Sequence, residues 1–99
     1  MTFQEKYERL IELFIERENL SIVKIQSEGK AGNNTAKEVY EEWKKYHDEE
    51  YWSYAMTEIS HMDEVPTPVR IMCLLDISYY FSQKLLEYYL EMDSEAFVK

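Results

Sequence analysis

The 99-residue sequence has only one cysteine, two glycines and two prolines. A chain with the single Cys73 cannot form an internal disulfide framework, which fits a reducing, cytoplasmic setting. The first residues, "MTFQEKYERL", lack the basic segment and apolar run of a secretory signal peptide. The most apolar stretch, 71–92, is interrupted by charged or amide side chains at five positions, so we expect no lipid-exposed span.

Basic residues are also few, with eleven against twenty acidic residues and a net charge of −9 at pH 7. Counting side chains gives −1 for residues 1–34, −4 for 35–62 and −4 for 63–99. Because duplex binding requires Lys and Arg to neutralise phosphates, this balance argues against direct nucleic-acid binding. An acidic surface instead attracts basic protein surfaces, although a net charge of this size can also serve solubility alone.

Apolar and aromatic side chains are abundant, at 45% and 15% of the residues, and nine of them are tyrosines. Disordered chains are poor in aromatic residues, so this composition indicates a folded protein. The length is close to the commonest domain size and is sufficient for one hydrophobic core. We therefore expect a single helical domain that spans residues 1–99.

The first predicted helix covers residues 2–18. Thr2 followed by Glu5 fits a capping box, and apolar residues then recur at intervals of three and four. Residues 21–26 are rich in β-branched side chains and favour either a short strand or one more helical turn. Both glycines lie in "EGKAGNN", which predicts the principal loop of the chain.

The next segment, "EVYEEWKKYHDEEYWSYAM", changes its apolar face midway. Asn34 or Thr35 is the expected cap of a helix whose apolar stripe swings by more than about a quarter turn near His47. Lysines precede this point and acids follow it, as at a helix end and a helix start. We predict a break at His47–Glu50 between helices 35–47 and 49–62. The alternative is one straight helix whose second half faces another partner.

A last helix is predicted over residues 68–92, with Thr67 as its cap and Pro68 at its first position. Its apolar side chains cover more than half the circumference, which implies contacts on two sides. The predicted fold is therefore all-α, a compact bundle of about four helices with this long C-terminal helix at its centre. A homodimer through the same helix is an alternative, and its interface would contain Ile71, Leu75, Tyr79, Leu86 and Tyr89.

No residue pattern identifies a catalytic, metal or cofactor site. Glu58 and His61 have the spacing found in di-metal bundles, but the second such pair that those sites need is missing. The pairs Glu38–Glu42 and Glu87–Glu91 are typical of a solvated helix face. They also leave open a Mg²⁺-dependent all-α nucleotide pyrophosphohydrolase as the enzymatic alternative. We expect no enzyme, no cofactor and no metal.

These observations favour a non-enzymatic protein that docks on a basic surface of a protein partner and occludes it. A nucleic-acid-binding groove is the natural target, since carboxylates can imitate phosphate charge. Small acidic proteins of this kind resemble phage or mobile-element inhibitors of host defence or replication, and antitoxins and immunity proteins belong to the same physical class. The predicted partner-binding residues are Glu38, Glu41, Glu42, Asp48, Glu49, Glu50 and Trp52.

Overall fold

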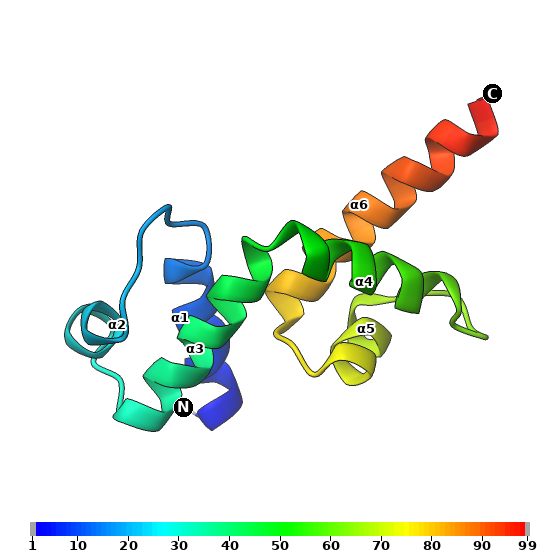
Figure 1. Ribbon diagram of the computed structural model, residues 1–99. Coiled ribbons are helices and arrows are strands. Elements are labelled where there is room, and N and C mark those ends of the chain that lie inside the picture. Colours follow the sequence, from blue (N-terminus) through cyan, green and yellow to red (C-terminus); the bar gives the residue numbers. More distant parts are fainter. Residues whose placement is uncertain (1, 99) are drawn as a thin grey trace. The chain divides into compact units, whose positions relative to one another are not determined.

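The structure is a computed structural model that describes residues 2–98, with side chains described through Met92. These residues form six helices and no strand: α1 Phe3–Phe14, α2 Ile22–Gly29, α3 Asn33–Tyr46, α4 Glu49–Ser60, α5 Pro68–Leu75 and α6 Tyr79–Val98 (Figure 1). The predicted all-α class is confirmed. The expected number of about four helices is too small, because residues 20–33 contain a helix and residues 68–92 contain a break.

The helices group into two compact units, Met1–Asp48 with α1 to α3 and Glu49–Lys99 with α4 to α6. We call them unit 1 and unit 2 and describe each by itself. That the whole chain folds as a single domain stays a prediction.

In unit 1, helix α1 begins as predicted, because the Thr2 hydroxyl accepts a hydrogen bond from the Glu5 amide at 3.2 Å. It ends at Phe14, four residues earlier than expected. Residues 15–18 contain no glycine or proline that would mark this end in the sequence. There the Arg17 amide donates to the Phe14 carbonyl at 3.1 Å, which is a tighter turn than the α-helix makes.

Residues 21–26 form neither a strand nor only one helical turn, since they are the N-cap and the first five residues of α2. Ser21 caps the two-turn helix α2 by accepting from the Lys24 amide at 3.2 Å, and Lys30 ends it with a left-handed φ of 52°. The two glycines therefore do not make a long loop. Gly29 lies inside α2, and Gly32 is the N-cap of α3, so the cap expected at Asn34 or Thr35 is wrong by two or three residues. The core of unit 1 consists of Leu10, Ile11, Phe14, Ile15, Ile25, Ala36 and Val39.

The predicted break near His47 is confirmed, since α3 ends at Tyr46 and α4 begins at Glu49. Lys44 and Lys45 occupy the last turn of α3, and Glu49 and Glu50 the first turn of α4. Both arrangements favour helix ends, because cations stabilise a C-terminus and anions an N-terminus.

In unit 2, the cap predicted at Thr67 is confirmed, and its hydroxyl accepts from the Arg70 amide at 3.2 Å. The prediction of one continuous helix over residues 68–92 is wrong, because α5 ends at Leu75. Asp76 has a left-handed φ of 54°, a conformation that Asp tolerates better than most residues, and its amide donates to the Met72 carbonyl at 2.8 Å.

Helix α6 starts after this break with its own buried cap. The Ser78 hydroxyl accepts from the Phe81 amide at 3.2 Å, and the Ser82 hydroxyl donates to the Ser78 carbonyl at 2.8 Å. Because of the break, α6 packs against both α5 and α4, so it is the middle helix of unit 2 rather than the continuation of α5. The core of this unit consists of Ala55, Ile59, Ile71, Leu75, Ile77, Phe81 and Leu85.

No helix within residues 2–98 combines the length and the apolar character that crossing a membrane requires.

Candidate protein-docking surface

The seven predicted docking residues divide between the two units. Glu38, Glu41, Glu42 and Asp48 belong to unit 1, whereas Glu49, Glu50 and Trp52 belong to unit 2. Six of them are exposed or half-buried. The structure does not join the seven into one described surface, so each group has to be judged within its own unit.

Glu42 is the predicted docking residue that the structure removes from the surface. Only 4% of it is exposed, and its Oε1 accepts a hydrogen bond from the Tyr7 hydroxyl at 3.1 Å. A carboxylate buried between α1 and α3 cannot contact a partner protein. The sequence places Glu42 only at the border of the apolar stripe of α3, three residues after Val39 and four before Tyr46, so the pattern alone does not bury it.

Tyr7 contributes to making the burial of Glu42 tolerable. Burial of the phenol, and next the negative charge of Glu42, raise the pKa of Tyr7 far above its ordinary value. The hydroxyl therefore keeps its proton and remains a donor to the carboxylate. The Tyr7 hydroxyl oxygen also lies 3.3 Å from the Glu38 carbonyl oxygen, so this one tyrosine of α1 donates to two acceptors on α3.

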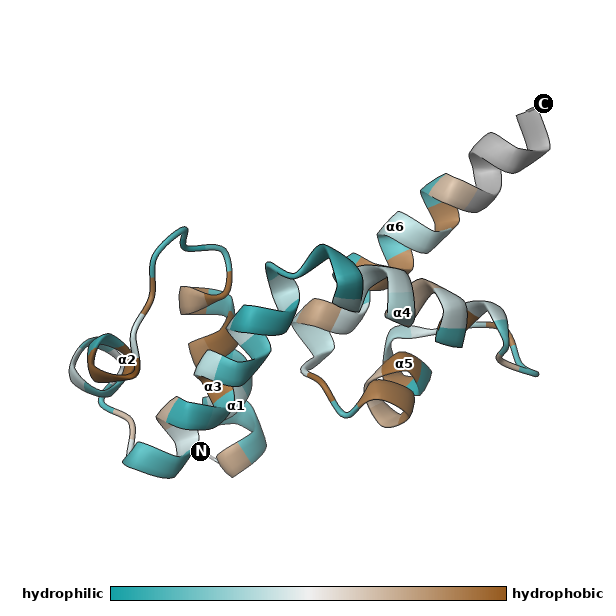
Figure 2. Cartoon of the chain, in the orientation of Figure 1, coloured by the Kyte–Doolittle hydropathy of each residue, from teal (hydrophilic) through white to brown (hydrophobic). Residues whose placement is uncertain are grey.

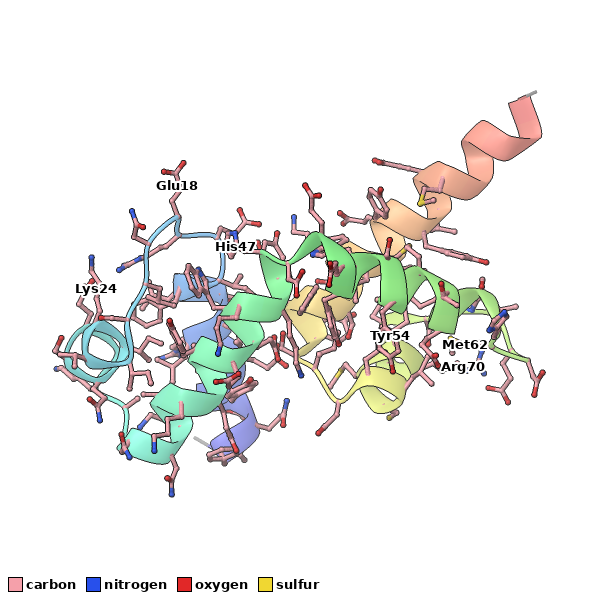
Figure 3. The ribbon with its side chains drawn as sticks, in the orientation of Figure 1. Glu18, Lys24, His47, Tyr54, Met62 and Arg70 are labelled. Carbon is pink, nitrogen blue, oxygen red and sulfur yellow. The ribbon has the colours of Figure 1, made fainter. Side chains whose placement is uncertain are left out.

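The aromatic residues at the end of α3 have a structural role in unit 1. The Trp43 indole donates to the Arg17 carbonyl at 2.8 Å, and His47 Nε2 lies 2.8 Å from the Ile15 carbonyl. A carbonyl only accepts, so this His47 nitrogen carries the proton. These two side chains hold the segment that follows α1 (His47 is labelled in Figure 3).

The two units differ more in net charge than the three sequence segments 1–34, 35–62 and 63–99 do. Residues 1–48 hold ten acids and eight bases, a net −2, whereas residues 49–99 hold ten acids and three bases, a net −7. In unit 1, one of the two exposed docking glutamates of α3, Glu41, is paired with Lys44 at 3.1 Å. Electrostatic attraction for a basic partner therefore resides mainly in unit 2.

Unit 2 also presents an aromatic pair that joins two of its helices. Trp52 of α4 packs against the buried Phe81 with ring centroids 5.7 Å apart, and it meets Tyr88 of α6 edge to face at 5.5 Å. Tyr88 is 44% exposed. After the break at His47–Glu50, the apolar stripe continues on another side of α4. There Trp52 packs on α6 of its own unit.

Exposed carboxylates lie on the same two helices. Glu49 precedes Trp52 by three residues on α4, and Glu91 follows Tyr88 by three residues on α6, so each lies on the side of its helix that carries the ring. Glu87 is adjacent to Tyr88. We call this set, Glu49, Trp52, Glu87, Tyr88 and Glu91, the α4–α6 surface. Sequence reasoning missed Tyr88, because its position in a continuous apolar arc suggested a core or interface residue.

The predicted subunit interface is only partly accessible. Ile71 is fully buried and Leu75 is 9% exposed, so both belong to the core of unit 2 and cannot meet a second subunit. The break after Leu75 explains why these two residues are buried, because it turns the face of α5 that carries Ile71 and Leu75 toward α6. Tyr79 is 40% exposed, and Leu86 and Tyr89 are half-buried.

The described residues contain no group of three or more His, Cys, Asp or Glu side chains placed to hold a metal ion. Glu58 is half-buried and His61 is exposed. The pair Glu38–Glu42 does not form an acidic helix face, because Glu42 points into unit 1 toward Tyr7.

Comparison with protein-family models, with curated proteins and with solved structures gives no match for this chain.

Proposed function

We propose that this protein is a small acidic binding module whose α4–α6 surface docks on a basic surface of a protein partner. The observation that carries this proposal is the Trp52–Tyr88 ring pair of unit 2, in which Trp52 is half-buried and Tyr88 is exposed, accompanied by Glu49, Glu87 and Glu91. Protein interfaces favour such an arrangement, with aromatic anchors at the centre and charged groups at the rim.

The aromatic and acidic groups would have different tasks in docking. The exposed edge of Tyr88 would supply buried apolar area, while the rim carboxylates steer a basic partner and raise the association rate. Lys and Arg side chains that line a nucleic-acid-binding groove match this charge pattern. Occupation of such a groove would exclude the nucleic acid, so inhibition by occlusion is the mechanism we propose.

A capture experiment with matched charge variants tests this function. The immobilised protein is exposed to a cell lysate, and captured partners are then challenged with duplex DNA and with salt. We expect partners that are lost in high salt and displaced by duplex DNA. Replacing both Glu87→Gln and Glu91→Gln should weaken their binding roughly tenfold, because two rim charges are lost.

The control is the double variant Glu12→Gln/Glu18→Gln, which changes two exposed glutamates of unit 1 and alters the net charge equally. It should retain the partners. Equal loss of binding in both double variants would reduce the effect to net charge and contradict the proposed surface. A captured partner that binds duplex DNA and this protein at the same time would contradict occlusion.

A further inference from the structure

Helix α5 is apolar around nearly its whole circumference, yet only one side of it is buried. Its sequence, "PVRIMCLL", contains the one charged residue Arg70. Ile71 and Leu75 face the core, whereas Val69 is 58% exposed, Leu74 is 42% exposed and Cys73 is exposed. Figure 2 shows α5 as a largely hydrophobic helix. A helix that is apolar on all sides is normally buried on all sides, so this outer face lacks a covering partner within the described chain.

The charges of this face favour a second copy of the chain over a basic partner. The one charged side chain within α5 is Arg70, which repels a basic surface. Two molecules of net charge −9 repel one another, and they approach at least cost where acidic side chains are sparse. The outer face of α5 is such a place in the otherwise acidic unit 2.

The sequence around Cys73 is self-complementary in charge. Arg70 lies three residues before Cys73, and the exposed Asp76 lies three residues after it. If two α5 helices pack antiparallel about a two-fold axis beside Cys73, Arg70 of each copy lies opposite Asp76 of the other. A two-fold interface repeats every contact, so the pairing occurs twice.

Arg70 is already held in position at the start of α5 (Figure 3). Its Nε donates to Glu64 at 2.9 Å, and its Nη1 donates to the Val65 carbonyl at 2.6 Å. A guanidinium has five N–H donors, so these contacts leave others for a carboxylate of the second copy. Pre-positioning reduces the entropy lost when the pair forms.

We propose that two copies of this protein associate through the outer face of α5, formed by Val69, Arg70, Cys73 and Leu74. The two α5 helices pack antiparallel with Cys73 at the two-fold axis. This association is independent of the α4–α6 surface, and it uses the face of α5 opposite to Ile71 and Leu75, the two predicted interface residues that are buried.

The lone cysteine makes the geometry testable by cross-linking. Disulfide formation requires Cα atoms roughly 4.4–6.8 Å apart, which two cysteines beside a two-fold axis between packed helices can reach. Mild oxidation of the purified protein with a copper–phenanthroline reagent should give a disulfide-linked dimer. Because the chain has a single cysteine, the link can only join Cys73 to Cys73. Light scattering over a concentration series should show the dimer without oxidant.

Two sets of variants check the face and the register. Val69→Glu should weaken dimerisation and slow cross-linking roughly tenfold, since it places a like charge in the interface. Val23→Glu, at a 71% exposed position of α2, is the matched control and should change neither. Arg70→Glu and Asp76→Lys should each weaken the dimer, and their combination should restore it. Lys30 shows that lysine is compatible with the left-handed C-cap conformation that Asp76 adopts.

A protein that remains monomeric across the concentration series overturns the proposal. It is also overturned by a dimer that survives Val69→Glu, or by a double charge exchange that does not restore association. If the wild-type protein is monomeric and Val69→Glu instead abolishes capture of a lysate protein, the face binds a different partner and self-association is wrong. All the self-association measurements use the purified protein alone, so their outcome is separate from that of the capture experiment.

Discussion

At the scale of single residues, the decisive feature is a carboxylate that lies where a sequence pattern expects a surface group. Glu42 is buried in unit 1 and accepts a hydrogen bond from Tyr7. Removing an ionised carboxylate from water is costly unless hydrogen bonds replace the lost solvent. The Tyr7 hydroxyl is therefore part of what allows α1 and α3 to pack together.

The first prediction concerns this hydroxyl. Tyr7→Phe should destabilise the protein by about 1.5–3 kcal/mol, because it deletes a hydrogen bond to a charged group that stays buried. Urea unfolding followed by circular dichroism measures this loss. Tyr40→Phe is the control, since Tyr40 is half-buried and its hydroxyl makes no hydrogen bond within the described residues. An equal loss in both variants would contradict a specific role of Tyr7.

Because the pKa of Tyr7 is raised, the stability that Tyr7 contributes should depend on pH. The unfolded chain releases the Tyr7 proton near the ordinary value of about 10, whereas the folded protein retains it. Above this pH the folded state binds more protons, so stability falls as pH increases. The contribution is fully present below about pH 10. The stability difference between wild type and Tyr7→Phe should therefore begin to shrink as the pH rises above about 10 and continue to shrink at higher pH.

At the scale of helices, the ends are set by residues that sequence patterns do not usually mark as breakers. Lys30 and Asp76 adopt left-handed conformations at helix C-caps, a position where glycine is commonest. The two glycines serve other purposes. Gly29 lies where α2 approaches α1, and a Cβ atom added there would lie 2.6 Å from Leu10 Cδ2 and 3.0 Å from Phe14 Cε2.

The second prediction follows from this close approach. Gly29→Ala should destabilise the protein by roughly 1 kcal/mol, although alanine favours a helix over glycine by a similar amount. The overpacking against Leu10 and Phe14 costs about 1–3 kcal/mol and outweighs that gain. Thermal or urea unfolding decides the sign. An unchanged or raised stability would mean that the Leu10 side chain moves aside at little cost.

Gly32→Ser is the matched comparison for that variant. Gly32 is the N-cap of α3 with an extended conformation, it makes no side-chain cap bond, and nothing lies within 4 Å of its Cβ position. Serine should cap the first turn and also reduce the freedom of the unfolded chain, for a gain of about 0.5 kcal/mol. The two glycine variants should therefore move stability in opposite directions.

At the scale of the whole molecule, the chain consists of two units of similar length with different charge and separate cores. Unit 1 carries −2 and unit 2 carries −7. Each unit also contains a hydrogen bond that involves a buried polar group: Tyr7–Glu42 in unit 1 and the Ser78 cap in unit 2. Removing one of these hydrogen bonds should lower the stability of its own unit.

The third prediction concerns the independence of the units. Tyr7→Phe should accelerate amide exchange in α1 to α3 and leave the core amides of unit 2 unchanged. Ser78→Ala should do the reverse, because it removes the buried cap of α6 at a cost of about 1–2 kcal/mol. Residue-resolved hydrogen exchange measures both effects. If either variant accelerates exchange in both units equally, the chain unfolds as the single domain expected from its length.

Local sequence was sufficient for much of the fold. The helical periodicity, the caps at Thr2 and Thr67 and the break at His47–Glu50 follow from side chains within a few residues of each feature, and the structure agrees. Local sequence predicted only part of the α4–α6 surface. Glu49 and Trp52 were identified, but Tyr88 comes from another helix thirty-six residues further along the chain, and no local pattern connects it with Trp52.

The sequence by itself determined that this protein is helical and acidic and where α1, α4 and α5 begin, because propensity, capping and charge act over one or two turns. Only the tertiary structure decided that Glu42 is inside, that Asp76 ends a helix and that Trp52 meets Tyr88. A buried carboxylate, a left-handed aspartate and a ring pair depend on contacts from distant parts of the chain. Those contacts outweigh the local preferences of the residues involved.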